Sequence, residues 1–228
     1  MFKEKNYQVI KGLISPEVSD IAYKYLLNKR RITKLMFEKR IISPYNDHWG
    51  VLSDGQIPDT WGNYGDVLMD TLLQHIKPTL EEQIDIRLTE TYTYTRIYKH
   101  GDILKRHKDR PSCAVSATMN IGGDEWPIYV DPTGSGTIIY DENNIAVDYQ
   151  VGTEPGVKVM LNPGDCLVYK GCELEHWRET FYGETCAQVF LHYNDASSPE
   201  AETNRYDGRP FVGIPKTTAD YLLDYGIK

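Results

Sequence analysis

Hydrophobic positions recur at helical spacing in two segments of the N-terminal part of the chain. Residues 13–28 begin with Ser15 in an N-cap position and Pro16 at the first helical position, a typical helix start. Residues 64–82 carry apolar side chains near the helical period, and Pro78 is expected to bend or end this second helix early. The pattern predicts two helices before any convincing strand, with an irregular excursion over residues 43–63 between them.

From Leu88 onward, the hydrophobic pattern changes to short strand-like runs separated by turn signals. The turn signals are Asp131-Pro132, Asn143-Asn144 and Asn162-Pro163-Gly164-Asp165. Their regular spacing over roughly a hundred residues suits a jelly roll or another sandwich better than alternating α/β units. We therefore predict a mainly β protein with N-terminal helices, of the α+β class.

One domain is expected, because 228 residues allow one sizeable core and no break in composition divides the chain. Within residues 1–228, we assign residues 1–87 to a helical support region and loop, and residues 88–194 to the jelly-roll core. Residues 195–228 are rich in Ser, Pro, Asp and Gly and form a C-terminal tail or lid, with a short helix near Ala219–Tyr225.

The composition is that of an ordinary soluble protein. Hydrophobic residues make up 40% of the chain and charged residues 25%, and no apolar run approaches the length needed to cross a bilayer. The first residues, Met-Phe-Lys-Glu-Lys-Asn, place charges where a signal peptide needs an apolar stretch, so we expect a cytoplasmic protein without a membrane partner. The four cysteines lack C-x-x-C spacing, which predicts buried reduced thiols.

A formal net charge of -8 argues against a general nucleic-acid binder, because affinity for phosphate backbones comes mainly from lysine and arginine. Two local basic patches remain. The first spans residues 24–40 and is expected to be a solvated helix face. The second, between Arg96 and Arg110, brackets an H-x-D motif and is suited to attracting an anionic co-substrate or substrate.

Two histidines and an aspartate carry the strongest chemical signal. His107 and Asp109 form the H-x-D motif at the end of a run that leads from a strand, and His176 follows a turn and strand within residues 161–170. Two imidazoles and one carboxylate on one face of an iron(II) ion leave three positions open, as binding of an oxoacid and dioxygen requires. We predict that these three residues are metal ligands.

Short motifs also arise by chance, so an alternative remains open. In that interpretation, His107 and Asp109 belong to a surface turn. His176 would then only cap a strand by hydrogen bonding.

Further features surround this motif. Tyr98 stands nine residues before His107, and Gly101 follows Tyr98 by three. A strand ends in asparagine at Ala117-Thr-Met-Asn120, and the turn before the last ligand contains Pro163-Gly-Asp165, a loose match to Pro-x-x-Gly-Asp. With these features, residues 88–194 resemble the prolyl 4-hydroxylase-like branch of the 2-oxoglutarate and iron(II)-dependent oxygenases. The resemblance implies a double-stranded β-helix with helices packed outside it.

The same resemblance implies a dioxygenase that uses iron(II), 2-oxoglutarate and dioxygen to hydroxylate a C–H bond, with succinate and carbon dioxide as co-products. A peptidyl proline is the acceptor it suggests, although a protein, peptide or small molecule would serve equally. Tyr98 would donate its hydroxyl to the distal carboxylate of 2-oxoglutarate. If Tyr98 faces inward, strand alternation places Arg96, Tyr94 and Tyr92 on the same face; the alternative is an edge strand with its aromatics at the surface.

One position departs from the family. A lysine or arginine is usual about ten residues after the second histidine, where this chain has Cys186. A carboxylate buried without a cation is costly, so another base must pair with 2-oxoglutarate if it binds in the usual way. Arg178 is the leading candidate and Arg96 the second, while Gln188 could add a hydrogen bond.

Two of these assignments have ordinary structural alternatives. Arg178 would form a surface salt bridge if it paired with Glu175 or Glu179. His192 shares the strand face of Gln188 and either lines the cavity or is a satisfied core histidine.

Two rival hypotheses accompany the oxygenase. The first is a cupin-like jelly roll that binds a metal or small ligand without oxygen chemistry, for which Cys186 is the main argument. The second is a purely structural β-sandwich, in which the three candidate ligands have no role.

Overall fold

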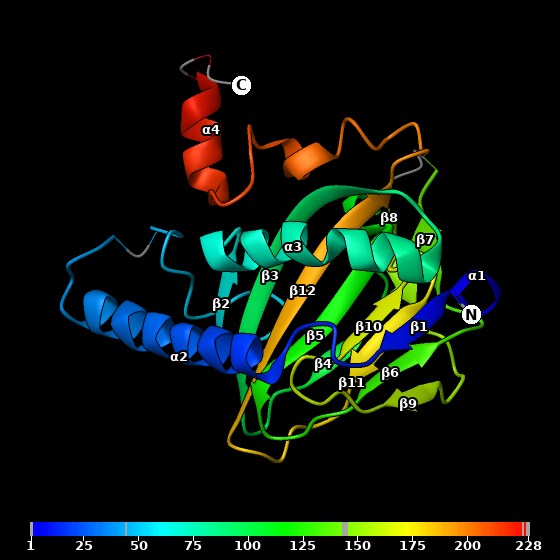
Figure 1. The fold of residues 1–228 in the computed structure, drawn as a ribbon, viewed down its shortest axis with the longest axis horizontal. Coiled ribbons are helices and arrows are strands. Elements are labelled where there is room, and N and C mark those ends of the chain that lie inside the picture. The colour runs from blue at the N-terminus through cyan, green and yellow to red at the C-terminus, as the bar shows by residue number, and fades with distance from the viewer. Residues whose placement is uncertain (1, 44, 143–145, 225, 227–228) are drawn as a thin grey trace.

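The structure is a computed structural model that describes residues 2–43, 45–142, 146–224 and 226 (Figure 1). The turn expected at Asn143-Asn144 and the helix end expected at Tyr225 lie outside these residues. The described residues form α1 (Phe2–Lys5), β1 (Tyr7–Ile10), α2 (Pro16–Glu38), β2 (Trp61–Tyr64), α3 (Val67–Ile84), β3 (Leu88–Lys99), β4 (Leu104–His107), η1 (Pro111–Cys113), β5 (Val115–Gly123), β6 (Ile128–Asp131), β7 (Thr137–Tyr140), β8 (Ala146–Gln150), β9 (Val157–Val159), β10 (Cys166–Tyr169), β11 (Glu175–Arg178), β12 (Thr185–Asp195), η2 (Arg205–Gly208) and α4 (Lys216–Asp224).

Two antiparallel sheets form the body of the protein. The larger sheet has the strand order β1-β10-β5-β12-β3-β2, the smaller has the order β4-β11-β6-β9, and β7 pairs with β8. Strands that follow one another in sequence are mostly not neighbours in these sheets, as in a jelly roll. The predicted fold class, mainly β with a jelly-roll core and N-terminal helices, is confirmed.

The main core lies between the larger sheet and the helices α2 and α3, which cover its outer face (Figure 1). In β12, alternation directs Val189 and Leu191 into this core. The intervening residues Phe190 and His192 face the other side, where they line a pocket between the two sheets. The sheet therefore separates a hydrophobic support layer from the face that carries polar chemistry.

Both predicted helices form, but their ends differ from the prediction. The Ser15 hydroxyl accepts from the backbone N–H of Val18, as expected of an N-cap, and α2 continues to Glu38 because no breaker interrupts it. Asp66 caps α3. Pro78 was expected to bend or end this helix early, and it does not end it: α3 runs to Ile84, where its buried apolar side chains still contact the core.

Two short strands precede β3, although no strand was expected before Leu88. β1 pairs with β10 and β2 pairs with β3, each at one edge of the larger sheet. Each has four residues, too few to show an alternating pattern, and β2 contains a glycine at position 62. The prediction of two helices before any strand was wrong for this reason.

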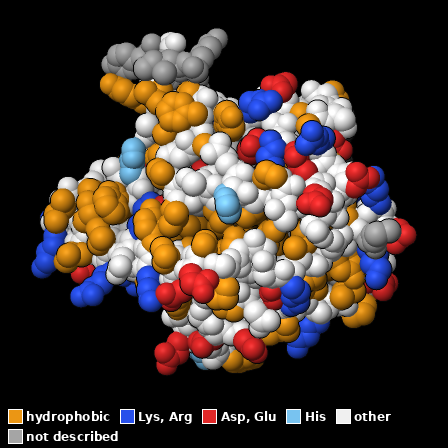
Figure 2. Space-filling model, viewed as in Figure 1, with side chains coloured by type: hydrophobic (Ala, Val, Ile, Leu, Met, Phe, Trp, Pro, Cys, Tyr) orange, Lys and Arg blue, Asp and Glu red, His pale blue; other side chains and the backbone are white. Residues whose placement is uncertain are grey.

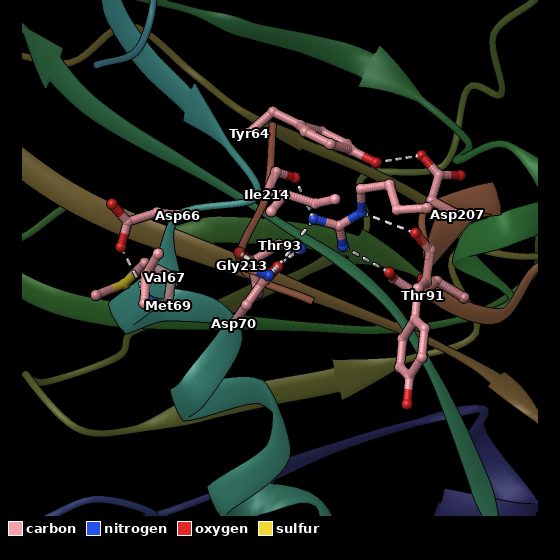
Figure 3. A network of polar contacts seen from close by, with 12 residues as sticks. Tyr64, Asp66, Val67, Met69, Asp70, Thr91, Thr93, Asp207, Gly213 and Ile214 are labelled. Atoms are coloured by element: carbon pink, nitrogen blue, oxygen red, sulfur yellow. Dashed lines mark hydrogen bonds and ion pairs between the residues drawn. The ribbon is translucent and has the colours of Figure 1, made fainter. Parts of the chain in front are cut away.

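A buried arginine anchors the C-terminal segment (Figure 3). Arg209 forms an ion pair with Asp70 of α3 at 2.9 Å and donates to the backbone oxygen of Thr91 at 3.0 Å. Oδ2 of Asp70, which binds Arg209, also accepts from the backbone N–H of Gly213 at 2.7 Å. Oδ1 of Asp70 accepts from the backbone N–H and the hydroxyl of Thr93. The segment between β12 and α4 is thereby fixed to α3 and β3.

Within the described residues, no helix combines the length and the apolarity that crossing a membrane requires. The cysteines Cys113, Cys166 and Cys186 are buried free thiols, as predicted, whereas Cys172 is half-buried.

Candidate metal centre and pocket

β4 and β11 bring the three predicted ligands together. The strands pair antiparallel with His176 opposite His107, and Asp109 follows the end of β4. One ligand atom from each residue lies within 4.8 Å of the other two. Asp109 Oδ1 is 3.4 Å from Nε2 of His176 and 3.8 Å from Nε2 of His107. Residues far apart in the sequence thus converge through a single strand pairing.

Each histidine is oriented by its own main chain. His107 Nδ1 lies 2.7 Å from the carbonyl oxygen of Lys105, and His176 Nδ1 lies 3.2 Å from that of Leu174. A carbonyl can only accept, so Nδ1 carries the proton and Nε2 keeps a lone pair toward Asp109. Burial, together with the neighbouring imidazole, lowers the pKa of His107 to about 4, so it is neutral near pH 7.

Asp109 is held as a carboxylate. Its backbone N–H donates to the Gly171 carbonyl at 2.9 Å, and the Ser116 hydroxyl donates to Oδ2 at 2.6 Å. Burial opposes ionisation, but His176 and the other nearby imidazoles outweigh it and hold the pKa of Asp109 well below its ordinary value. Neutral imidazoles and an ionised carboxylate are the forms that ligate a divalent metal.

The cluster faces a pocket of about 300 Å³ between the sheets. Its other lining residues are Gln56, Tyr92, Tyr94, Arg96, Leu104, Lys108, Arg110, Cys113, Tyr169, Phe190 and His192. The inward face predicted for Tyr92, Tyr94 and Arg96 is therefore what the structure shows, and the edge-strand alternative does not hold. Tyr98, on the same face, is fully buried.

Arg178 lies buried in the protein, 1% exposed. Its guanidinium donates to the carbonyl of Trp126 and, at 3.0 Å, to Oε1 of Gln188. Within the part of the chain that the structure describes, its Nε has no hydrogen-bond partner and no carboxylate forms an ion pair with it. The alternative of a surface salt bridge is wrong, because Arg178 is not at the surface and Glu175 pairs instead with Arg106.

Tyr98 is buried in the same cluster as Trp126 and Cys186. Among the described residues, its hydroxyl also has no hydrogen-bond partner. Burial raises the pKa of Tyr98, so the group is a neutral phenol able to donate. The predicted residues Tyr98, Arg178 and Gln188 are thus all buried, with donor capacity left unused in the first two.

Arg96, in contrast, already has a carboxylate partner. Its guanidinium donates twice to Oδ2 of Asp54, at 2.9 and 2.7 Å, and the Tyr94 hydroxyl donates to the same oxygen at 2.8 Å. Oδ1 of Asp54 accepts the backbone N–H groups of Gln56 and Ile57. Arg96 therefore fixes the irregular excursion to the pocket wall.

Gln56 and Ser116 lie beside the metal cluster and were not predicted, whereas His192 was predicted either to line the cavity or to lie in the core. Gln56 Nε2 lies 3.2 Å from Nε2 of His107, from a loop that no sequence pattern places in space. Ser116 and His192 contact one another at 3.0 Å behind Asp109. The strand face of His192 was predictable, but its partner was not, since β5 and β12 are separated in the chain.

The basic patches have different surroundings. In the second patch, Arg106 pairs with Asp131 and Glu175, and Arg110 pairs with Asp207 at 2.7 Å. Figure 2 shows lysine and arginine beside apolar side chains at the left of the view, where the C-terminal end of α2 lies. Most of this first patch is exposed, as predicted for a solvated helix face.

Comparison with known proteins identifies structural relatives only. No family model and no curated protein matches the sequence. A prolyl-4-hydroxylase of Pseudomonas putida is 11% identical with a TM-score of 0.53, covering 86% of this chain and 96% of that one. The epimerase SnoN, a non-haem α-ketoglutarate-dependent enzyme of nogalamycin biosynthesis, is 15% identical with a TM-score of 0.58, covering 86% and 78%.

A prolyl hydroxylase of Trichoplax adhaerens, in complex with a peptide fragment of hypoxia inducible factor, is 16% identical with a TM-score of 0.51 and coverages of 90% and 87%. At such identities the likeness concerns the fold. The chain therefore has the fold of the 2-oxoglutarate-dependent oxygenases, including prolyl hydroxylases. The resemblance inferred from the sequence is confirmed at that level.

Proposed function

We propose that this protein is an iron(II)- and 2-oxoglutarate-dependent dioxygenase that hydroxylates a C–H bond of an acceptor and releases succinate and carbon dioxide. One observation carries the proposal. Two imidazole Nε2 atoms and one carboxylate oxygen, from His107, His176 and Asp109, converge at a pocket. This donor set is the facial triad of non-haem iron oxygenases.

The residues fit both groups that the fold implies. His107, Asp109 and His176 would hold the iron, since Nδ1 of each histidine is engaged by a backbone carbonyl and the Asp109 carboxylate accepts from Ser116. Arg178 and Tyr98 would bind the distal carboxylate of 2-oxoglutarate, because Nε of Arg178 and the hydroxyl of Tyr98 are buried and have no hydrogen-bond partner among the described residues. If Arg178 provides the positive charge, a cation is not needed at position 186, where this chain has a cysteine.

Iron(II) with 2-oxoglutarate and dioxygen would supply the oxidising power, and the chain supplies position and exclusion of water. Asp109 and the two histidines would hold the metal, and the pocket that they line would receive the reactants. Tyr92 and Phe190 form apolar walls there, which orient an acceptor and keep bulk water away from the reacting atoms.

The residues of the pocket wall indicate the kind of acceptor. The pocket wall combines tyrosines with the cations Lys108 and Arg110. A peptide or a small molecule with a polar group near the reacting carbon suits such a wall, and a peptidyl proline is the acceptor suggested by the sequence resemblance. We propose a cytoplasmic, single-domain enzyme, with its jelly-roll core over residues 88–194.

An anaerobic titration tests the proposal. Addition of iron(II) and then 2-oxoglutarate is expected to produce a weak visible charge-transfer band, which is lost in His107→Ala. His75→Ala removes an exposed histidine of α3 and serves as the matched control that keeps the band. Absence of the band in folded wild-type protein would contradict the oxygenase.

A cupin-like protein that binds metal or a small ligand without oxygen chemistry is the second candidate. Cys186 favours it, because no cation stands at the position where the family has one. A screen for succinate release over peptides, free amino acids and nucleosides separates the two. Metal binding without succinate release in any mixture, the 2-oxoglutarate-only reaction included, would favour this candidate.

A further inference from the structure

The two carboxylate oxygens of Asp109 have different surroundings. Oδ1 faces Nε2 of both histidines, at 3.4 and 3.8 Å. Oδ2 points the other way and accepts a hydrogen bond from the Ser116 hydroxyl at 2.6 Å. Ser116 lies on β5, in the sheet opposite the metal-binding strands, and is 1% exposed.

Ser116 itself has a second partner. His192 Nδ1 lies 3.0 Å from its hydroxyl oxygen, and the His192 ring is buried against Tyr92 with 4.6 Å between ring centroids. A hydroxyl has one hydrogen, so when Ser116 donates to Asp109 it must accept from His192. The carbonyl oxygen of Cys113 is the other acceptor within reach of that hydrogen, but it is more distant, at 3.2 Å compared with 2.6 Å for Asp109.

The backbone of Gly171 packs closely against the Ser116–Asp109 contact. Gly171 accepts the backbone N–H of Asp109, and a Cβ at Gly171 would collide with Oδ2 of Asp109 and with the hydroxyl oxygen of Ser116. β10, just before Gly171, pairs with β5 at Ser116 itself. The serine and the aspartate are therefore held against each other by two strands.

We propose that Ser116 and His192 are a positioning pair that restricts Asp109 to one metal-binding oxygen, an inference that rests on the proposed function. The hydrogen bond from Ser116 holds Oδ2 in place, and Oδ1 is the oxygen that faces Nε2 of both histidines. A carboxylate that bound through both oxygens would occupy one of the three positions that the oxoacid and dioxygen need. The Ser116–His192 pair would thus keep these coordination positions open and also support the affinity for the metal.

Ser116→Ala tests this role with Co(II) alone, under anaerobic conditions and without any turnover. The dissociation constant is expected to rise about 10- to 100-fold, the usual effect of removing a hydrogen-bond partner of a metal ligand. The visible Co(II) spectrum is also expected to change, because the carboxylate becomes free to bind through both oxygens. Ser116→Thr, which keeps the hydroxyl, should restore both towards wild type.

Ser19→Ala is the matched control. Ser19 is equally buried, at 1% exposed, and its hydroxyl donates to the carbonyl of Ile121 on the far side of the sheet. Removal of the Ser19 hydroxyl should lower the free energy of unfolding about as much as Ser116→Ala does and leave the Co(II) affinity unchanged. Unfolding of the metal-free variants in urea shows whether Ser116→Ala has lost its fold.

His192→Phe separates the second member of the pair. The ring still packs on Tyr92, but the Nδ1–H donor is lost, so a smaller loss of Co(II) affinity than in Ser116→Ala is expected. Co(II) affinity and spectrum of folded Ser116→Ala equal to those of wild type would overturn the inference while leaving the proposed function intact. Failure of wild-type protein to bind Co(II) or iron(II) would instead overturn both.

Discussion

Arg178 is a buried cation that forms no ion pair with any described carboxylate. Burying a charge is costly unless it is paired, and the partners of this guanidinium within the described residues are the neutral oxygens of Trp126 and Gln188. Burial lowers the pKa of Arg178, although the ring of Trp126, 5.1 Å away, offers some compensation. An entering carboxylate would relieve this cost, which is the physical reason to expect an anion here.

Arg178→Met is expected to weaken 2-oxoglutarate binding at least about 30-fold, since losing one partner of a buried charge pair costs about 2 kcal/mol or more. Methionine has nearly the same length but no charge. Isothermal titration of Mn(II)-loaded protein with 2-oxoglutarate under nitrogen measures the change, and Mn(II) affinity should stay as in wild type. Equal loss of both affinities would show that Arg178 supports the fold and not the co-substrate.

Residue-scale prediction succeeded where strand alternation or a known spacing applied. The convergence of His107, Asp109 and His176 followed from a motif and a returning strand. Arg178 is buried, but the register of β11 shifts between His176 and Arg178, and Arg178 is not among the residues that line the pocket. Asp54 and Ser116 were missed, because hydrogen bonds between distant segments leave no pattern in either segment alone.

At the scale of elements, the excursion over residues 43–63 is irregular but anchored. Asp54 satisfies both its oxygens, one with backbone N–H groups of its own turn and the other with Arg96 and Tyr94. Ile57, next in the loop, is 2% exposed and packs in the cluster around Tyr98. Residues 54–57 are thus fixed to the pocket wall, and Gln56 lines the pocket.

Asp54→Asn is expected to destabilise the protein by about 1.5–3 kcal/mol, because Arg96 loses a charged partner. Burial raises the pKa of Asp54, but Arg96 and the hydrogen bonds outweigh burial and the net pKa is lowered. The contribution is therefore fully present above the unfolded pKa of about 3.9 and fades as pH falls through the lower folded pKa. Urea denaturation should show a constant difference from wild type between pH 5 and 7 that shrinks below about pH 4. A difference that grows on acidification would contradict this assignment.

The C-terminal segment, expected as a tail or lid, is held by one buried ion pair. Arg209→Met should lower the free energy of unfolding by about 3–5 kcal/mol, since it leaves Asp70 charged and buried. Arg205→Met, which breaks an exposed pair with Glu202 in the same segment, is the control and should cost no more than about 1 kcal/mol. Chemical denaturation compares the two, and equal effects would argue against an anchoring role for Arg209.

Element boundaries were predictable where local chemistry sets them. Ser15 marked the start of α2 correctly. Pro78 misled, because tertiary packing of the last turns of α3 overrides the local penalty of a proline. β1 and β2 were invisible because short edge strands acquire their structure from β10 and β3, not from their own sequences.

At the scale of the whole molecule, the jelly roll followed from evenly spaced β segments, while the order of strands in each sheet did not. Hydrophobic alternation states which residues face a core but carries no information about which strand lies beside which. The pairing of β11 with both β4 and β6 is therefore a product of tertiary packing.

Metal binding should stabilise the whole fold, because it adds a link between two strands that are otherwise joined by their ladder and by the Arg106–Glu175 ion pair. At a Co(II) concentration about 100 times the dissociation constant, the gain expected is about 2.7 kcal/mol, and a chelator should abolish it. Thermal unfolding with and without Co(II) measures the shift. His176→Ala should remove the metal dependence, and a shift that survives in this variant would place the ion elsewhere.

The pairing of His107 with His176 has a consequence for how the chain can vary. Chain length between the two histidines does not set their separation, since the register of β4 with β11 does. Extra residues placed in the β7–β8 arm, which pairs only with itself, lengthen a closed loop at small entropic cost and leave that register alone. The β7–β8 arm is therefore free to diversify in size, whereas a shift of one residue in β11 would turn its side chains to the opposite face and separate the ligands.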